Sequence, residues 1–313
     1  VIQPRKVYTE PTLGMIETQT AVCPGCESLS SVIGITKGEA VFRCHECSLL
    51  FYEQSVRTQL PKDSDWWRDL SENGGVVLKK SLAQMRPTYN RQLAQLEKMT
   101  ERRQLLDVGA GGGVFLAAAR ERGWKVMGHD SNPHAAAAAK VAFDLFFVSG
   151  LNEIAKGSID VLRLSHVLEH VPFPVDFLRE MRLTLHAEGV IVAIVPNAAS
   201  LTYSVVNSFR RKRVTLPRLA LPMSPGFHPL GFTPRALEIV AKSAGFTVIS
   251  LRSVSMGNRD YYPWFYDGLL RRIPLSEIGL KTLVRYWGPI ALDNFGNKFG
   301  RGHWLVACLR RAH

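Results

Sequence analysis

The fold of this chain is decided by residues 105–130, which read LLDVGAGGGVFLAAARERGWKVMGHD. A short apolar run ends in a glycine turn, an alanine-rich helical stretch follows, and a second β-like run closes on Asp130. This order predicts a strand, a turn, a helix and a strand, the nucleotide-binding half of a doubly wound sheet. Glycines in the turn let the backbone approach a ligand where a Cβ would collide. An acid at the tip of the second strand can accept hydrogen bonds from both hydroxyls of a ribose.

The glycine turn has the pattern D-x-G-x-G-x-G, from Asp107 to Gly113. A nicotinamide site instead uses G-x-G-x-x-G, with the pyrophosphate at the helix N-terminus. A carboxylate two residues before the first glycine suits a cationic ligand better than a pyrophosphate. The pattern resembles motif I of the class I S-adenosylmethionine-dependent methyltransferases. The turn alone leaves open a glycine-rich turn in some other α/β enzyme.

This resemblance implies an α/β fold with a Rossmann-like, seven-stranded doubly wound sheet of six parallel strands and one antiparallel strand. It also implies that Asp107 positions the methionine part of the cofactor and that Asp130 binds its ribose. Many family members place an acid after the third strand to contact the adenine; this chain has no acid at residues 149–152, and Asn152 or the backbone would bond the adenine edge instead. The predicted S-adenosyl-L-methionine site consists of Asp107, Gly109, Ala110, Gly111, Gly113, Asp130, Ser131, Leu151, Asn152 and Ser165.

A segment rich in histidine follows the predicted fourth strand, residues 159–165. It runs from His166 to Pro172 and reads HVLEHVP. Since ligands bind at the carboxyl ends of the strands in open α/β sheets, we expect this segment to line the site. With the following helix and Pro196-Asn197, it resembles a type 11/23-like methyltransferase subfamily that often carries an N-terminal zinc-binding segment.

The predicted catalytic residues are His166, Glu169 and His170. The histidines are four residues apart, which places them on one helical face, with Glu169 beside them. One imidazole would take the proton of the acceptor, oriented by Glu169. Two alternatives remain open: the histidines cap the strand–helix junction, or they bind a divalent cation together with Glu169 and His228. The cation hypothesis rests on a similar E-x-x-E-H segment in some methyltransferases that act on adjacent hydroxyls.

Four of the five cysteines form two C-x2-C pairs, Cys23 with Cys26 and Cys44 with Cys47, separated by 17 residues. This spacing is typical of a structural zinc site, in which four thiolates complete a tetrahedron and leave no open position for catalysis. Short strands over residues 31–36 and 40–43 would complete a zinc ribbon. Two redox pairs, or thiols without metal, are the alternative.

The chain divides into four predicted parts. Residues 1–20 are a lead-in, 21–52 the zinc ribbon, 53–103 a linker with lid helices, and 104–313 the methyltransferase domain. Pro87 is expected to break the amphipathic helical region over residues 76–103. The last part contains a cap insertion, residues 198–232, and an insertion rich in aromatic and basic residues, 256–296. Asn132 and Thr233, each followed by proline, are expected to begin helices.

The 313 residues carry a formal net charge of +12, which favours anionic partners. No apolar run approaches the length of a membrane span, and the first residues lack the apolar core of a signal peptide. We therefore expect a cytoplasmic protein. Paired cysteines in a reducing compartment favour metal over disulfides.

The acceptor predicted first is a small molecule or saccharide, linked to a nucleotide or a lipid. The basic run 210–213, flanked by apolar residues, would allow peripheral contact with an anionic membrane at its inner face; a solvated loop is the alternative. An RNA methyltransferase that uses the ribbon for recognition is less favoured, because the bases are scattered and no RNA-binding motif is present. A third hypothesis is a cofactor-binding protein without activity, against which the intact glycine motif argues. The sequence does not predict an oligomeric state.

Overall fold

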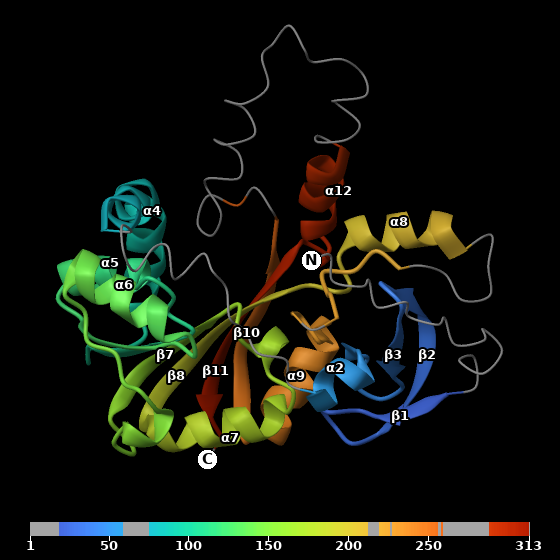
Figure 1. Ribbon diagram of the computed structural model, residues 1–313, viewed down its shortest axis with the longest axis horizontal. Helices are drawn as coiled ribbons and strands as arrows, with labels where there is room; N and C mark the ends of the chain where they lie inside the picture. The colour runs from blue at the N-terminus through green and yellow to red at the C-terminus, as the bar shows by residue number, and fades with distance from the viewer. Residues whose placement is uncertain are drawn as a thin grey trace, which may run out of the picture.

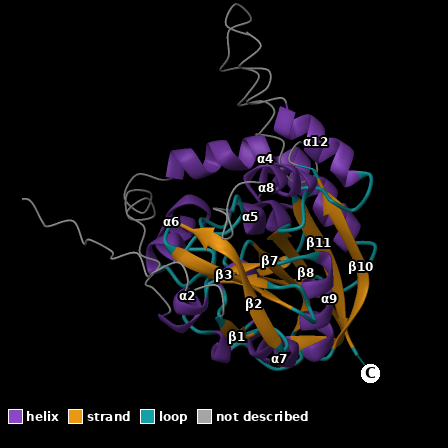
Figure 2. Ribbon diagram, turned by 90° about the vertical axis from the view of Figure 1, so that its right-hand side faces the viewer, coloured by secondary structure: helices purple, strands orange, loops and turns teal. Residues whose placement is uncertain are grey.

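The computed structural model describes residues 19–58, 75–211, 219–225, 227–255, 258 and 288–312. These residues form a six-stranded and a five-stranded sheet, which lie side by side in Figure 1. Figure 2 views the molecule from the side of the smaller sheet, whose strands lie in front of the larger one.

The larger sheet has the strand order β10-β11-β8-β7-β5-β6. Strands β6, β5, β7 and β8 pair in parallel, and β11 runs antiparallel to both β8 and β10. This is the doubly wound arrangement with one antiparallel strand that the sequence predicts. Its strands are β5 (Gln104–Val108), β6 (Lys125–His129), β7 (Ile159–Ser165), β8 (Leu185–Pro196), β10 (Phe246–Val254) and β11 (Trp304–Arg311).

In place of the seventh strand that the resemblance implies, residues 144–148 form one parallel bridge, between Gly128 and Phe147. The ring of Phe147 lies against Gly128, where a Cβ would be 2.6 Å from a ring carbon. Asp144 ends the preceding helix with a left-handed φ of 52°. The chain therefore meets β6 at one close point, and this edge of the sheet carries a bridge in place of a longer ladder.

Helices cover both faces of the larger sheet (Figure 1). One face carries α4 (Gly75–Leu96), α5 (Val114–Glu121) and α6 (Pro133–Phe143); the other carries α7 (Pro174–Thr184) and α9 (Pro234–Ser243). Helices α6 and α9 begin as predicted. The Asn132 side chain accepts a hydrogen bond from the amide of His134, and the Thr233 hydroxyl accepts one from the amide of Ala236.

Pro87 lies inside α4 and does not break it, so the expected break is wrong. A proline removes one helical hydrogen bond and usually kinks or ends a helix. Here Leu82 and Leu93, one turn or more to either side of Pro87, are buried in a single apolar cluster with residues of α5. Packing of the buried face keeps the helix continuous across the proline.

The smaller sheet contains the two strands predicted for residues 31–36 and 40–43, which are β2 and β3, together with three further strands. It consists of β1 (Thr20–Val22), β2 (Leu29–Thr36), β3 (Glu39–Cys44), β4 (Leu50–Phe51) and β9 (Leu230–Gly231), all antiparallel. Strand β9 comes from the cap insertion and pairs Gly231 with Leu50 and Leu230 with Phe51. Main-chain hydrogen bonds thus join the ribbon directly to the rest of the molecule. The short helix α2 (Glu53–Thr58) follows β4.

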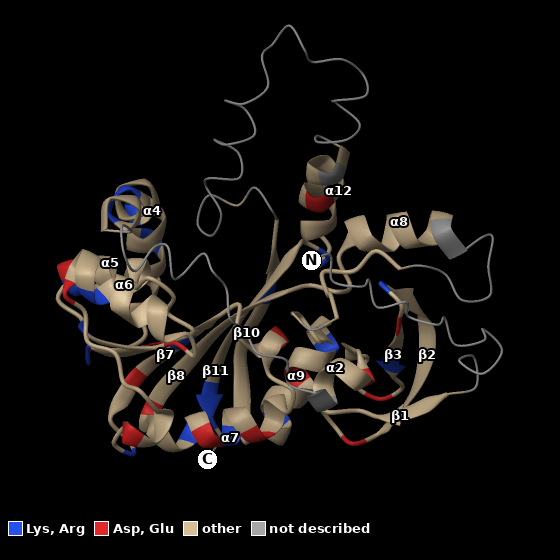
Figure 3. Cartoon of the chain, in the orientation of Figure 1, with Lys and Arg blue, Asp and Glu red and all other residues tan. Residues whose placement is uncertain are grey.

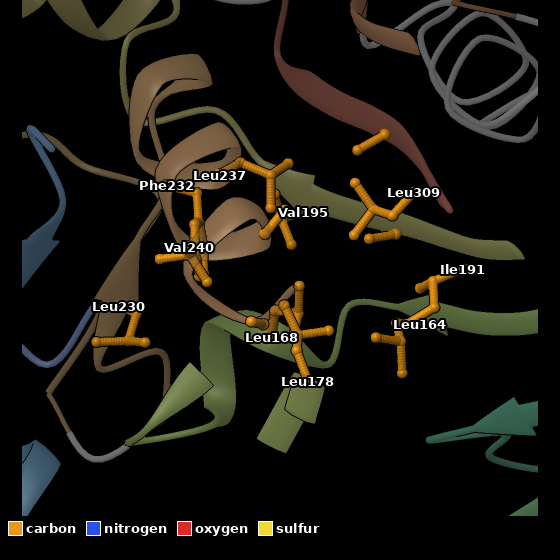
Figure 4. Packing of buried hydrophobic residues seen from close by; sticks show 14 of the residues in the cluster. Leu164, Leu168, Leu178, Ile191, Val195, Leu230, Phe232, Leu237, Val240 and Leu309 are labelled. Carbon is orange, nitrogen blue, oxygen red and sulfur yellow. The ribbon is translucent and has the colours of Figure 1, made fainter. Parts of the chain in front are cut away.

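One apolar core extends from the larger sheet into the ribbon. In Figure 4, Leu237 and Val240 of α9 lie beside Val195 of β8 and Phe232. The same cluster includes Phe51 of β4 and three of the paired cysteines. Burial of side chains of this size contributes about 1.5–3 kcal/mol each, so the ribbon and the larger sheet stabilise each other.

Within the cap insertion, residues 201–211 form α8 (Leu201–Arg211), which packs against α12 (Gly288–Asn297). The end of the basic run, Lys212 and Arg213, and most of the insertion 256–296 lie outside the described residues. Among the described helices, none combines the length and the hydropathy needed to cross a bilayer.

Candidate active site

The glycine turn lies between the carboxyl end of β5 and the start of α5. Gly109, Gly111 and Gly113 have φ angles of 71°, 52° and 71°, a region that residues with a Cβ rarely adopt. Gly109 and Ala110 donate their amide hydrogens to the carbonyl of His129, which ties the turn to the end of β6. The turn therefore lies where the sequence predicts it, at the edge of the sheet where parallel strands end.

Asp130 follows β6, and two backbone amides hold its carboxylate. Oδ2 accepts a hydrogen bond from the amide of Gly111 at 2.8 Å, and Oδ1 accepts one from the amide of Asn132 at 2.9 Å. Each carboxylate oxygen has a second lone pair. The group is fixed in place and can still accept two hydrogen bonds from a ribose.

Asp107 is only 1% exposed, and Nη1 of Arg163 lies 3.1 Å from each of its carboxylate oxygens. Arg163 faces Asp107 from β7, with its guanidinium 4.2 Å from the centre of the Phe115 ring. Burial raises the pKa of Asp107, and the positive charge of Arg163 opposes this rise. A cation of the chain itself thus pairs with Asp107, and contact between Asp107 and the methionine part of the cofactor stays a prediction. Sequence patterns do not reveal Arg163, because a single base in an apolar strand has no periodic signature.

The remaining predicted cofactor residues lie at the same edge of the sheet. Ser131 is exposed next to Asp130, and Ser165 is the last residue of β7. Leu151 and Asn152 belong to a short 3-10 helix, η1 (Leu151–Glu153). Their roles toward the cofactor stay predictions.

The histidine segment does not form the expected helical face. His166 has a left-handed φ of 58°, and only Leu168–His170 form a single 3-10 turn, η2. The prediction that His166 and His170 share a helical face is therefore wrong. The left-handed residue breaks the helical path, so that the two imidazoles contact different partners. Such strained backbone in a residue with a Cβ is concentrated at functional sites.

His166 contacts Glu169, as the sequence suggested. Its Nδ1 lies 3.0 Å from Oε1 of Glu169, and its ring meets Trp304 edge-on at 4.8 Å between centroids. The adjacent Val167 lies against the glycine turn, because a Cβ on Gly109 would be 2.6 Å from Cγ2 of Val167. The histidine segment and the predicted cofactor turn are therefore in direct contact.

His170 lies beside His228, with 4.5 Å between the ring centroids. Glu169, His170 and His228 each offer one ligand atom, and these atoms lie within 4.8 Å of one another. His166, the fourth residue of the cation hypothesis, contacts Glu169 instead. The tertiary fold thus brings together a histidine of the cap insertion and the segment after β7.

The side chains near the start of β11 include buried polar groups that the sequence patterns do not reveal. His303 is buried, and burial together with the nearby His166 lowers its pKa to about 4. Tyr203 of α8 lies beside it, 5.5 Å between ring centroids, and burial raises the pKa of Tyr203 to about 12. These side chains are uncharged at neutral pH and contribute a polar but neutral wall next to His166.

The four paired cysteines converge as predicted, with all four sulfurs within 4.8 Å of one another. Cys23 Sγ lies 3.5 Å from Cys47 Sγ, and Cys26 Sγ lies 3.4 Å from Cys44 Sγ. These separations are too long for a disulfide bond and close to the roughly 3.8 Å between sulfurs that bind zinc at about 2.3 Å.

Backbone amides also favour thiolates at this centre. The amides of Gly25, Cys47 and Leu49 donate to the sulfurs of Cys23, Cys44 and Cys47. Without a metal, hydrogen bonding with Cys47 lowers the pKa of Cys23, while the same contact raises the pKa of Cys47 and burial raises that of Cys44. The donor set and its geometry therefore fit a zinc ion held by four thiolates.

A cavity of about 320 Å³ separates the ribbon from α8. It begins just after β8 ends, and the described residues that line it include two arginines and no acid. Arg301 donates to the Ser204 hydroxyl at 2.6 Å, and α8 carries no acidic side chain along its length (Figure 3). The lining residues are Ile33, Arg43, Leu50, Ala198, Ala199, Ser204, Asn207, Ser208, Leu219, Leu221, Thr233 and Arg301.

Residues 81–251 match the family model of a methyltransferase domain. The chain belongs to this methyltransferase family. Its larger sheet has one antiparallel strand, β11 between β8 and β10, as the resemblance to the class I S-adenosylmethionine-dependent members implies.

Curated relatives of this methyltransferase include two mycobacterial proteins described as uncharacterised methyltransferases. One from Mycobacterium sp. (strain KMS) is 39% identical over 94 residues, which are 29% of this chain and 37% of the relative. One from Mycobacterium leprae (strain TN) is 38% identical over 96 residues, 29% of this chain and 36% of the relative. The match spans little more than a third of the length of these relatives.

Solved structures similar to the methyltransferase have low sequence identity. A SAM-dependent methyltransferase from Archaeoglobus fulgidus is 18% identical, with 74% of this chain and 94% of that chain covered and a TM-score of 0.46. A complex of the Haloferax volcanii Trm112 methyltransferase activator with a methyltransferase gives 15% identity, coverage of 79% and 97%, and a TM-score of 0.47.

Proposed function

We propose that the protein transfers the methyl group of S-adenosylmethionine to a small-molecule or saccharide acceptor that carries an anionic group. The observation that carries the acceptor class is the cavity between the ribbon and α8. Two arginines, Arg43 and Arg301, line it together with hydroxyl and amide side chains, and no described lining residue is acidic. Guanidinium groups bind phosphate and carboxylate oxygens in a fixed planar geometry.

The cofactor would lie over the glycine turn, with its ribose on Asp130. The two backbone amides that hold the carboxylate support this placement, since a group fixed in advance loses little entropy on binding. The carboxyl ends of β5, β6 and β7 surround the same position. The methyl donor would then be next to Val167 and the histidine segment.

His166 is the proposed general base. A carboxylate only accepts hydrogen bonds, so the contact with Glu169 places the hydrogen of neutral His166 on Nδ1 and the lone pair on Nε2. Nε2 can therefore accept a proton from the acceptor as the methyl group is transferred. Methyl transfer from a sulfonium is an in-line displacement, for which alignment of the partners alone can supply several kcal/mol.

The four cysteines would hold a structural zinc ion. The ion would fix β2 and β3, which contribute Ile33 and Arg43 to the wall of the cavity. Zinc with four thiolates has no open position and supplies folding energy rather than chemistry. Its proposed role is to build one side of the acceptor site.

The experiment that tests the function combines the purified protein with S-adenosylmethionine labelled on the methyl group and a cell extract. Labelled products are fractionated into small anionic molecules, lipid and RNA. Label in anionic saccharides or other small molecules, or in a lipid-linked saccharide, is the expected result. Label confined to RNA would instead indicate an RNA methyltransferase. Absence of label from every fraction would contradict the proposed methyl transfer.

A variant test addresses the acceptor cavity itself. Arg301→Gln should raise the KM for the labelled acceptor and leave the affinity for S-adenosylmethionine unchanged. Arg86→Gln, which removes an exposed base on α4 far along the chain from the cavity, is the matched control. Equal KM values for both variants would mean that the cavity does not bind the acceptor.

A further inference from the structure

The group formed by Glu169, His170 and His228 has the composition of a metal site. Glu169 and His170 belong to η2, directly after β7, whereas His228 comes from the cap insertion. The backbone places His228 firmly, because its amide donates to the carbonyl of Ser224 at 2.9 Å and its carbonyl accepts from the amide of Ser224 at 3.3 Å. One ligand atom from each of the three side chains lies within 4.8 Å of the other two.

Both imidazoles are oriented by backbone carbonyls. Nδ1 of His170 lies 2.6 Å from the carbonyl oxygen of Phe227, and Nδ1 of His228 lies 3.1 Å from that of Pro222. A carbonyl oxygen only accepts hydrogen bonds, so Nδ1 carries the hydrogen in each ring and the lone pair is on Nε2. Histidines that bind metals in proteins are fixed in this way, with the second nitrogen donating to a carbonyl or carboxylate.

The carboxylate of Glu169 has one oxygen engaged and one that lacks a donor. The side chain is 1% exposed, and Oε1 pairs with Nδ1 of His166 at 3.0 Å. Oε2 is buried and accepts no hydrogen bond from the residues that the structure describes. A buried carboxylate oxygen without a partner is costly. A cation beside Oε2 would remove this cost.

We propose that Glu169, His170 and His228 bind a divalent first-row transition metal ion, distinct from the ion of the four cysteines. Two imidazole nitrogens and one carboxylate oxygen are ligands that suit Mn²⁺, Fe²⁺, Co²⁺ and Zn²⁺ better than Mg²⁺. Ligand atoms at about 2.1 Å from one ion lie at most roughly 4.2 Å apart. The three side chains therefore need only a small adjustment to close around it.

Three protein ligands leave at least one coordination position for a water molecule or an acceptor oxygen. An ion in this position would orient a hydroxyl of the acceptor next to His166, which contacts the same carboxylate. This role selects acceptors methylated on oxygen, and it rests on the methyl transfer proposed above. Binding of the ion rests on the geometry of the three side chains alone.

Manganese separates this site from the cysteine site, because thiolates favour zinc and carboxylate with imidazole accepts Mn²⁺. The full chain, with its cysteine site filled with zinc, is titrated with Mn²⁺ while electron paramagnetic resonance follows the free ion. We expect one bound Mn²⁺ per chain. Glu169→Gln and His228→Gln should each weaken binding by more than the roughly 10–100-fold that loss of an outer partner of a metal ligand costs.

His186→Gln is the matched control, since His186 lies near the start of β8, at the opposite end of that strand from the site. Its Mn²⁺ affinity should equal that of the wild type. If Glu169→Gln does not fold, His228→Gln, which replaces a partly exposed side chain, decides the question. No Mn²⁺ bound by the folded wild type, or equal binding by the wild type and His228→Gln, would overturn the proposal. Affinity for S-adenosylmethionine, measured by calorimetry on the same samples, is a separate readout, so that failure of the metal site and failure of the methyltransferase proposal are distinguished.

Discussion

Arg163 donates hydrogen bonds to both carboxylate oxygens of Asp107, at 3.1 Å each, from the neighbouring position on the adjacent strand. Both side chains are largely buried, with 11% of Arg163 and 1% of Asp107 exposed. The pair lies directly before the glycine turn. It therefore connects the stability of the sheet to the geometry of the proposed cofactor site.

Arg163→Met should destabilise the protein by about 3–5 kcal/mol, because it leaves a buried carboxylate without its cation. The free energy of unfolding in urea at neutral pH measures the effect. Arg86→Met, which removes an arginine paired with Glu121 on the surface, is the matched control and should cost about 0–1 kcal/mol. Equal losses in the two variants would mean that the buried pair does not stabilise the sheet.

The loss of unfolding free energy caused by Arg163→Met should also depend on pH. Burial raises the pKa of Asp107 in the folded state, so this group favours folding most at low pH, and its contribution falls as pH rises through the raised pKa. Without Arg163 the folded pKa rises further. The difference in unfolding free energy between wild type and variant should therefore widen from about pH 4, the ordinary aspartate value, towards neutral pH. A difference that is constant with pH would assign the loss to packing alone.

Asp130→Ala should weaken S-adenosylmethionine binding, because each lost hydrogen bond to the charged carboxylate is worth about 1.5–3 kcal/mol. Titration calorimetry measures the affinity. Asp144→Ala removes an exposed carboxylate at the end of α6 and should leave the affinity unchanged. Equal affinities of wild type and Asp130→Ala, or tight binding of a nicotinamide dinucleotide, would contradict the proposed cofactor site.

Gly109→Ala should disturb the contact between the glycine turn and the histidine segment. The new Cβ would lie 2.6 Å from Cγ2 of Val167, and the φ of 71° adds strain of about 1–3 kcal/mol. Gly123→Ala is a control with strain alone, since its φ is 84° and no atom lies within 4 Å of the new Cβ. Gly109→Ala should lower Tm more than Gly123→Ala, and the additional Val167→Ala change should recover the difference. Failure of that recovery would show that the clash is not with Val167.

One zinc ion per chain should be found by metal analysis of protein prepared without added zinc. Cys26→Ser and Cys44→Ser should each reduce the zinc content strongly, because a tetrahedral site loses one of its four ligands. Cys308→Ser, which changes the buried cysteine of β11, should retain the full content. Four thiols that titrate freely in the folded wild type, with no zinc present, would exclude the site.

Replacement of Arg210, Arg211, Lys212 and Arg213 by serine should abolish binding to anionic vesicles at low salt and raise the KM for the acceptor. Each base near an anionic membrane surface contributes about 1 kcal/mol. Vesicle sedimentation measures the binding, and cofactor affinity should not change. Absence of vesicle binding by the wild type would leave α8 as a cap over a soluble acceptor, without a membrane role.

The sequence alone determined the elements whose signals are local. The glycine turn, the helix starts at Asn132 and Thr233, and strand β7 lie where short patterns of glycine, capping side chains and apolar runs place them. Each C-x2-C turn brings two cysteines together within four residues, and the neighbouring strands β2 and β3 bring the two pairs together. These features depend on interactions between near neighbours in the chain, which a sequence pattern records directly.

Only the tertiary structure decided which distant residues meet. Arg163 pairs with Asp107 from 56 positions away, β9 joins the ribbon sheet, and His228 lies beside His170, 58 positions before it. Pro87 remains inside a helix because packing of its buried face outweighs its local preference. The left-handed His166 directs the two histidines to different partners, which spacing alone could not indicate. Burial and strand register create these contacts, and both arise from the free energy of the whole packed core rather than from any short segment of the sequence.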